Sequence, residues 1–339
     1  MERLLITLIL VCTMNNITNA QNPFYGQYHT PHEAVPFDRI ETEHYEPAIL
    51  EGIKLQNAEI EAIIQNPEKA DFTNTIEAFE ESGKLLDKVV AVFGNMLSAE
   101  TNDDLQELAQ KIMPLLSEHS NNITLNEKLF ARVKEVYNQK ETLQLTQEQK
   151  QLLENAYNSF IRHGANLEGE AREEYRRLTT ELSKLTLTFS ENNLKETNAY
   201  QMLLTKKESL AGLPEIIIEV AAETAKNEEK EGWAFTLHAP SYIPFMTYSD
   251  NRDLRQKLYM AYNTKCTHDN EFNNIDIVKK IANTRMKIAQ LLGYKDYAEY
   301  TLKKRMAENS KSVYKLLNQL LEAYTPTAQQ EYKEIQELA

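Results

Sequence analysis

Glycine is scarce in this chain, with 9 residues in 339, against a usual share of about 7%. Proline supplies only 10 residues, and no Gly-Ser linker or low-complexity tract is present. Since tight turns depend on these two residues, their scarcity argues against β-sandwiches, β-barrels and collagen-like repeats. Hydrophobic residues make up 42% and charged residues 26%, which suits a packed core. The composition predicts a folded, mainly helical protein.

Positively charged residues are also few. Lys and Arg number 37 against 51 Asp and Glu, so the net charge is −14 and the isoelectric point lies near 5.1. This excess of negative charge repels phosphate backbones, so we expect no nucleic-acid partner.

Cysteine occurs twice, at Cys12 and Cys266. If Cys12 is removed with a leader segment, Cys266 has no partner for an intrachain disulfide, and the fold depends on core burial. His268 follows closely, and a nucleophilic Cys–His pair is conceivable there. Residues so near in sequence rarely form such pairs, so we interpret Cys266 as a structural thiol.

Long apolar runs are absent apart from the nine residues of Leu4–Cys12. A membrane-spanning helix needs about 20 apolar residues, so no span is expected. The run instead predicts the core of a signal peptide over residues 1–20, cleaved after Ala20 to leave Gln21. Export follows, with the periplasm as the expected location.

Two alternatives for this segment stay open. Glu2 offsets Arg3, which weakens the positive charge that precedes a signal-peptide core. Lipid attachment at Cys12 is one alternative, but it favours a small preceding residue and Val11 is bulky. The other is a buried N-terminal strand or helix of a cytosolic protein.

Helical periodicity dominates the rest of the chain. Apolar residues recur at steps of three and four in three stretches: 75–97, 171–189 and 313–324. Thr146 and Gln149 have the spacing of a capping box, which predicts the start of a helix running toward His163. We interpret each stripe as core packing between long helices, and not as a cofactor site.

One region favours a sheet. Residues 200–205 and 233–237 are rich in aliphatic and aromatic side chains, and we expect them to pair as a small two-stranded ribbon. Between them, Pro214 suits the first turn of a helix over 216–226, although Ile216–Ile218 also fits a short strand. The charged run 226–231 predicts a solvated loop.

Few residues have the spacing that metal chemistry needs. The chain holds seven histidines: His29, His32, His44, His119, His163, His238 and His268. His29 and His32 flank Pro31 and are expected in a loop, and Pro36 stands where a zinc-peptidase helix needs its second histidine. Glycine-rich phosphate loops, G-x-S-x-G elbows and C-x-x-C pairs are missing.

Three carboxylate pairs remain: Glu80–Glu81, Asp103–Asp104 and Glu173–Glu174. Each falls on a polar helical face, where a solvated surface is the expected explanation. We therefore assign no catalytic, cofactor-binding or metal-binding residue to this chain.

Several longer stretches carry a resemblance to a known family. They are residues 36–49 (PFDRIETEHYEPAI), 74–77 (NTIE), 235–252 (FTLHAPSYIPFMTYSDNR), 258–263 (LYMAYN) and 291–300 (LLGYKDYAEY). Together they resemble the M3 zinc metallopeptidases, the thimet-oligopeptidase-like family, and are most similar to its bacterial peptidyl-dipeptidase branch. The similarity runs from about residue 24 to residue 339.

This resemblance implies a helical fold and the hydrolysis of short peptides. Members of the family bind zinc through a helical HExxH motif, which lies in the second half of a chain roughly twice as long. Since this sequence has no such motif, residues 21–339 are similar to the N-terminal half alone. That half lines a channel for short peptides and partners the catalytic half, so no zinc ligand is carried over.

Two hypotheses follow from this resemblance. In the first, the chain is one part of an exported zinc peptidase, inactive alone; in the second, it is a non-enzymatic helical module that binds peptides or a partner protein. Residues 329–339 keep helical periodicity without a terminating Gly or Pro, which favours the first hypothesis. The nucleotide sequence beyond Ala339 would distinguish them.

Overall fold

The computed structural model describes residues 22–338, which divide into two compact units. Unit 1 contains the described residues up to Glu181 and those from Thr284 onward, whereas unit 2 contains Leu182–Asn283. Both boundaries fall inside long helices, and neither lies at the charged run 226–231. The predicted signal peptide, residues 1–20, lies outside the described residues.

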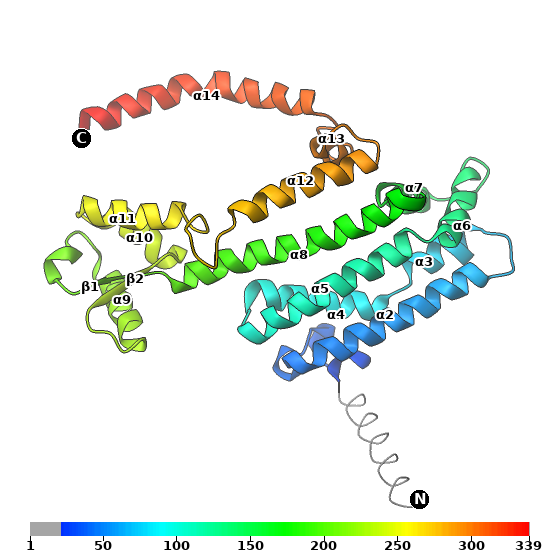
Figure 1. Ribbon diagram of the computed structural model, residues 1–339, viewed down its shortest axis with the longest axis horizontal. Helices are drawn as coiled ribbons and strands as arrows, with labels where there is room; N and C mark the ends of the chain where they lie inside the picture. Colours follow the sequence, from blue (N-terminus) through cyan, green and yellow to red (C-terminus); the bar gives the residue numbers. More distant parts are fainter. Residues whose placement is uncertain (1–21, 339) are drawn as a thin grey trace, which may run out of the picture. The chain divides into compact units, whose positions relative to one another are not determined.

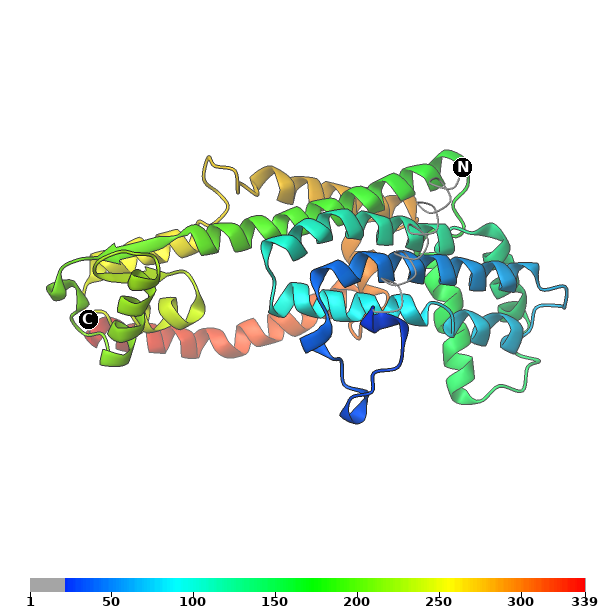
Figure 2. The same cartoon turned by 90° about the horizontal axis from the view of Figure 1, so that it is seen from below.

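Unit 1 consists of helices (Figure 1). In chain order they are η1 (Pro23–Tyr25), η2 (Pro31–Glu33), η3 (Phe37–Arg39), α2 (Thr42–Gln65), η4 (Phe72–Glu77), α3 (Ala78–Glu80), α4 (Lys84–Ala99), α5 (Asp103–Thr124), α6 (Glu127–Asn138), α7 (Gln147–Arg162), the first part of α8 (Gly169–Ala199), the second part of α12 (Ile275–Leu291), α13 (Tyr297–Leu302) and α14 (Ser310–Leu338). Helices α2, α4 and α5 lie side by side, as both Figures 1 and 2 show.

The core of unit 1 joins elements that are far apart in sequence. Its buried residues include Ile60, Ile63, Phe72, Ile76, Leu129, Val133, Val136, Leu153 and Phe160. Phe160 of α7 stacks against Phe130 of α6 at a centroid distance of 5.8 Å and meets Phe79 at 5.4 Å. The capping box predicted at Thr146 and Gln149 is confirmed, and it starts α7.

The single helix predicted over residues 75–97 is wrong. The chain instead forms the π-helical turn η4 and the short α3, and it then breaks at Gly83 before α4 begins. Gly83 has a φ of +80°, and a Cβ there would lie 2.3 Å from the side-chain amide nitrogen of Gln56. Its N–H donates to the carboxylate of Glu59 on α2 at 2.8 Å. The break therefore comes from the close approach of α2.

Unit 2 surrounds the one sheet found among the described residues. Its elements are the second part of α8, β1 (Gln201–Leu204), η5 (Lys207–Leu210), α9 (Glu215–Asn227), β2 (Trp233–Thr236), α10 (Ala239–Tyr248), α11 (Arg252–Asn263) and the first part of α12. The antiparallel ribbon of β1 and β2 confirms the predicted pairing, and Met202 lies opposite Phe235. Phe235 is fully buried and meets Phe245 of α10 edge-on at 4.6 Å.

Further helix predictions had mixed outcomes. The helix after Pro214 is confirmed as α9, which excludes the alternative strand at Ile216–Ile218. The stripe over 313–324 does lie on one helix, α14, but its interpretation as core packing is wrong, because no described residue of α14 is buried. Among residues 22–338, we find no helix with the length and apolar character needed to cross a membrane.

Candidate functional site

Glu196, near the end of α8, holds the loop that joins α11 to α12. One carboxylate oxygen accepts hydrogen bonds from His268 Nδ1 at 2.9 Å and from Asn270 Nδ2 at 3.1 Å. The other oxygen accepts from the backbone N–H of Cys266. Burial on its own raises the pKa of Glu196, but these hydrogen bonds together outweigh burial and hold the pKa below its usual value. An ionised carboxylate thus anchors the loop at neutral pH.

The far end of the same loop is anchored by Asn274, which is buried. Its side chain donates to the carbonyl of Phe189 at 2.9 Å and accepts from Asn192 Nδ2 at 3.0 Å. Its backbone N–H donates to the carbonyl of Cys266 at 2.8 Å. We call residues 264–274 the anchored loop, because α8 fixes it at both ends.

Cys266 and His268 do not form a nucleophilic pair. Burial, followed by the hydrogen bond and charge of Glu196, raises the pKa of the Cys266 thiol to about 11, so the thiolate is a minor species at neutral pH. His268 directs Nδ1 to Glu196, and its Nε2 lies 3.1 Å from Thr264 Oγ1. Neither ring nitrogen is left for Cys266, which agrees with a structural thiol.

Thr264, His268 and Glu196 stand in the order of a nucleophile, a base and an orienting acid. The Thr264 hydroxyl, however, donates to the carbonyl of Met260 at 2.7 Å, so its proton does not point at the imidazole. With its proton on the Met260 carbonyl, the Thr264 hydroxyl is not activated by His268, and the hydrogen bonds of this row hold the loop in place.

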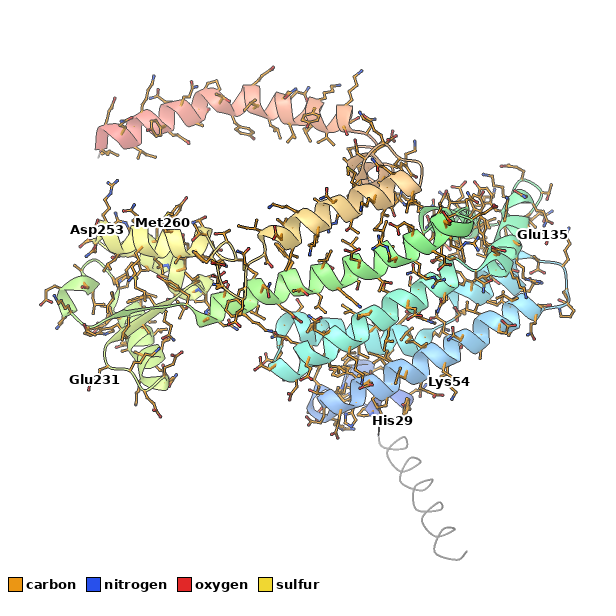
Figure 3. All side chains as sticks on the ribbon, viewed as in Figure 1. His29, Lys54, Glu135, Glu231, Asp253 and Met260 are labelled. Atoms are coloured by element: carbon orange, nitrogen blue, oxygen red, sulfur yellow. The ribbon has the colours of Figure 1, made fainter. Side chains whose placement is uncertain are left out.

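A pocket of about 460 Å³ lies next to the anchored loop in unit 2. Its lining consists of Glu196, Tyr200, Leu237, Met260, Ala261, Thr264 and His268. Met260, labelled in Figure 3, is half exposed on α11. Glu196, Thr264 and His268 already have hydrogen-bond partners, so Tyr200, Leu237, Met260 and Ala261 supply most of the surface left for a ligand.

An acidic groove of about 1100 Å³ runs between α2 and α5 in unit 1. Its charged lining residues are Glu41, Glu43, Glu46, Asp104, Glu107 and Lys111. Lys111 pairs with Glu46 at 2.5 Å, so one carboxylate is neutralised and four are not. The groove therefore repels anionic ligands and favours neutral or cationic ones.

The other carboxylate pairs behave as surface groups. Glu80, Glu81 and Glu173 are exposed, and Glu174 pairs with Arg177 on its own helix at 2.7 Å. These positions agree with the expected solvated helical faces.

The residues present do not fit the zinc ion that the family resemblance implies. Residues 22–338 contain no group of three or more His, Cys, Asp or Glu side chains that could hold a metal ion. His32 lies in the short η2 and has a φ of +58°, so the loop expected at His29 and His32 is irregular backbone. His119 is buried against Gln56, with Nε2 and Oε1 2.7 Å apart, and burial lowers its pKa.

Comparison with known proteins gives a family context. The sequence model of peptidase family M3 matches residues 245–339. Dipeptidyl carboxypeptidase of Escherichia coli is 34% identical over 316 residues, which are 93% of this chain and 46% of that protein. The resemblance to the M3 peptidases is confirmed.

Other relatives are likewise matched over about half of their length. Oligopeptidase A of Salmonella typhimurium is 29% identical over 322 residues, or 94% of this chain and 47% of the relative. Dipeptidyl carboxypeptidase of the same organism is 33% identical over 316 residues and is covered to 46%. The chain spans about half the length of the curated relatives it matches.

In this M3-like chain, the stretches that carry the resemblance hold the fold together. Asn74 fastens η4 by accepting from Arg132 at 3.0 Å and donating to the carbonyl of Lys69 at 2.9 Å. Tyr300 attaches α13 to α7: its carbonyl accepts from Arg162 at 3.0 Å, and the guanidinium lies 4.1 Å from the ring centroid. The Arg132–Asn74 and Arg162–Tyr300 contacts each span more than 50 residues, as do those of Glu196, so no local pattern marks Arg132, Arg162 or Glu196.

Proposed function

We propose that this chain is the non-catalytic, peptide-binding half of an exported M3-type zinc peptidase that acts on short peptides. The observation that carries the proposal is the coverage: more than nine-tenths of this chain matches peptidases of which it covers less than half. The half proposed here precedes the zinc motif and forms one wall of the peptide channel. Zinc and the general base would then come from the complementary half.

The acidic groove and the pocket beside the anchored loop are the surfaces that suit peptides. Each lies within one unit: the groove between α2 and α5, and the pocket between α8, α11 and the anchored loop. The groove favours peptides without negative side chains, whereas the pocket has room for a large apolar side chain.

Reconstitution tests the catalytic part of this proposal. The chain is co-expressed with the portion of E. coli dipeptidyl carboxypeptidase that the match does not cover, and dipeptide release from short peptides is measured. We expect each polypeptide alone to be inactive and the pair to be active. Dipeptide release by the chelator-washed chain alone would contradict the proposal. A chain that binds peptides but forms no active pair would support a non-enzymatic peptide-binding module.

Export is a separate part of the proposal. Residues 1–20 are proposed to act as a signal peptide, and N-terminal sequencing of secreted protein is expected to start at Gln21. An intact Met1, or a lipid on Cys12, would contradict this.

A further inference from the structure

We propose that one face of α14 is the surface on which the complementary half of an M3-type peptidase docks. This inference rests on the proposed function and specifies the partner's contact surface. Helix α14 carries many large apolar side chains, and these side chains are exposed.

Helix α14 has 29 residues, yet the structure buries none of its described side chains. Nine large apolar residues on it are between 40% and 89% exposed: Tyr314, Leu316, Leu317, Leu320, Leu321, Tyr324, Tyr332, Ile335 and Leu338. Within unit 1, α14 packs on α13, which precedes it directly in sequence. Figure 3 shows side chains projecting along the whole helix, and Figure 1 labels it at the C-terminal end of the chain.

The apolar residues are not scattered. Val313, Leu317, Leu320 and Tyr324 follow one another at steps of four, three and four, which places them on one face over three turns. Leu316 and Leu321 flank this row and widen it. Such a stripe fits helices that pack lengthwise, and its exposed surface is of the kind that marks an interaction site.

The family match favours the complementary half as the occupant. Helix α14 lies wholly inside residues 245–339, so its sequence is of the M3 type. The relatives contain about as much chain again as this match covers, and that additional chain is the candidate partner. A second copy is less favourable, because two chains with a net charge of −14 repel each other.

The charges on α14 specify the partner further. Lys311 and Lys315 lie in its first two turns, whereas its last eight residues hold three glutamates, Glu331, Glu334 and Glu337, and one lysine, Lys333, so that this end is acidic overall. A complementary surface is therefore acidic opposite the start of the helix and basic opposite its end.

Co-purification tests the inference. The uncovered portion of E. coli dipeptidyl carboxypeptidase carries an affinity tag, and this full chain is co-expressed without one. The test variant is Leu317→Glu with Leu321→Glu, both exposed, and the matched control is Asn318→Glu with Gln329→Glu on the polar face. Circular dichroism and chain yield establish that every variant still folds.

We expect the test variant to reduce co-purification at least about tenfold, and the control to change it by less than about twofold. Equal retention of the two variants, or no co-purification of the unmodified chain, would overturn the inference. A dimer of the unmodified chain that the test variant converts to a monomer would also overturn it, in favour of a second copy. A complex that forms through α14 but hydrolyses no peptide would leave the docking surface intact and refute the proposed catalytic function.

Discussion

The anchored loop allows a sharp test of what Glu196 does. Replacing Glu196 with Gln keeps the size of the side chain but removes its charge and one acceptor oxygen. The carboxylate is 12% exposed and faces three donors. Hydrogen bonds to charged groups contribute about 1.5–3 kcal/mol each, and the new amide group turns a donor toward a donor, so we expect a loss of about 2–4 kcal/mol at neutral pH.

The effect has a defined pH dependence. Hydrogen bonds hold the pKa of folded Glu196 below the ordinary value of 4.5. Its stabilising contribution is therefore complete above about pH 4.5 and disappears as the pH falls through the lower folded pKa. The difference in unfolding free energy between Glu196→Gln and the unmodified chain must shrink in acid.

Urea unfolding followed by circular dichroism measures the global loss, and hydrogen exchange of residues 264–274 reports the loop itself. Glu223→Gln is the control, because Glu223 is exposed on α9 and loses the same charge; it should change stability by less than about 0.5 kcal/mol. The reasoning is refuted if Glu196→Gln leaves both the midpoint and the loop protection unchanged at neutral pH.

Three further outcomes are expected. Burial lowers the pKa of His119 from its ordinary 6.5, so the unmodified chain should lose stability as the pH falls below about 6.5. In urea unfolding at several pH values, His119→Gln should show a weaker dependence of stability on pH. An identical dependence in the two proteins would contradict this. Gly83→Ala should destabilise by about 1–3 kcal/mol because of the positive φ and the nearby Gln56 amide, and an unchanged urea midpoint would argue against it. Metal analysis of the chelator-washed chain after incubation with zinc should find less than stoichiometric metal, whereas tight one-to-one binding would show that a site has been overlooked.

Local patterns predicted those elements whose cause is itself local. The Thr146 capping box and the Pro214 start need only neighbouring residues, and both begin helices in the structure. The β1–β2 ribbon also followed from composition, because its strands are aliphatic and aromatic. The sequence prediction placed Gly83 inside one long helix. The structure interrupts the helix there because of contacts with α2, whose Gln56 and Glu59 lie more than 20 residues earlier.

The candidate site was harder to predict for the same reason. The spacing of Cys266 and His268 suggested a nucleophilic pair. Glu196, which bonds to both residues and keeps them apart chemically, lies about 70 residues earlier in the sequence. Nothing in the sequence around Glu196 distinguishes it from the surface carboxylates of other helices.

The sequence by itself determined the helical class, the acidic character and the M3 resemblance, because periodicity, composition and motifs are properties of short stretches. Only the tertiary structure decided which apolar stripes are buried. The row at Val313–Tyr324 has the same spacing as buried rows elsewhere, yet it lies exposed on α14. Periodicity records that a helix has an apolar face, whereas burial depends on whether another part of the fold reaches that face.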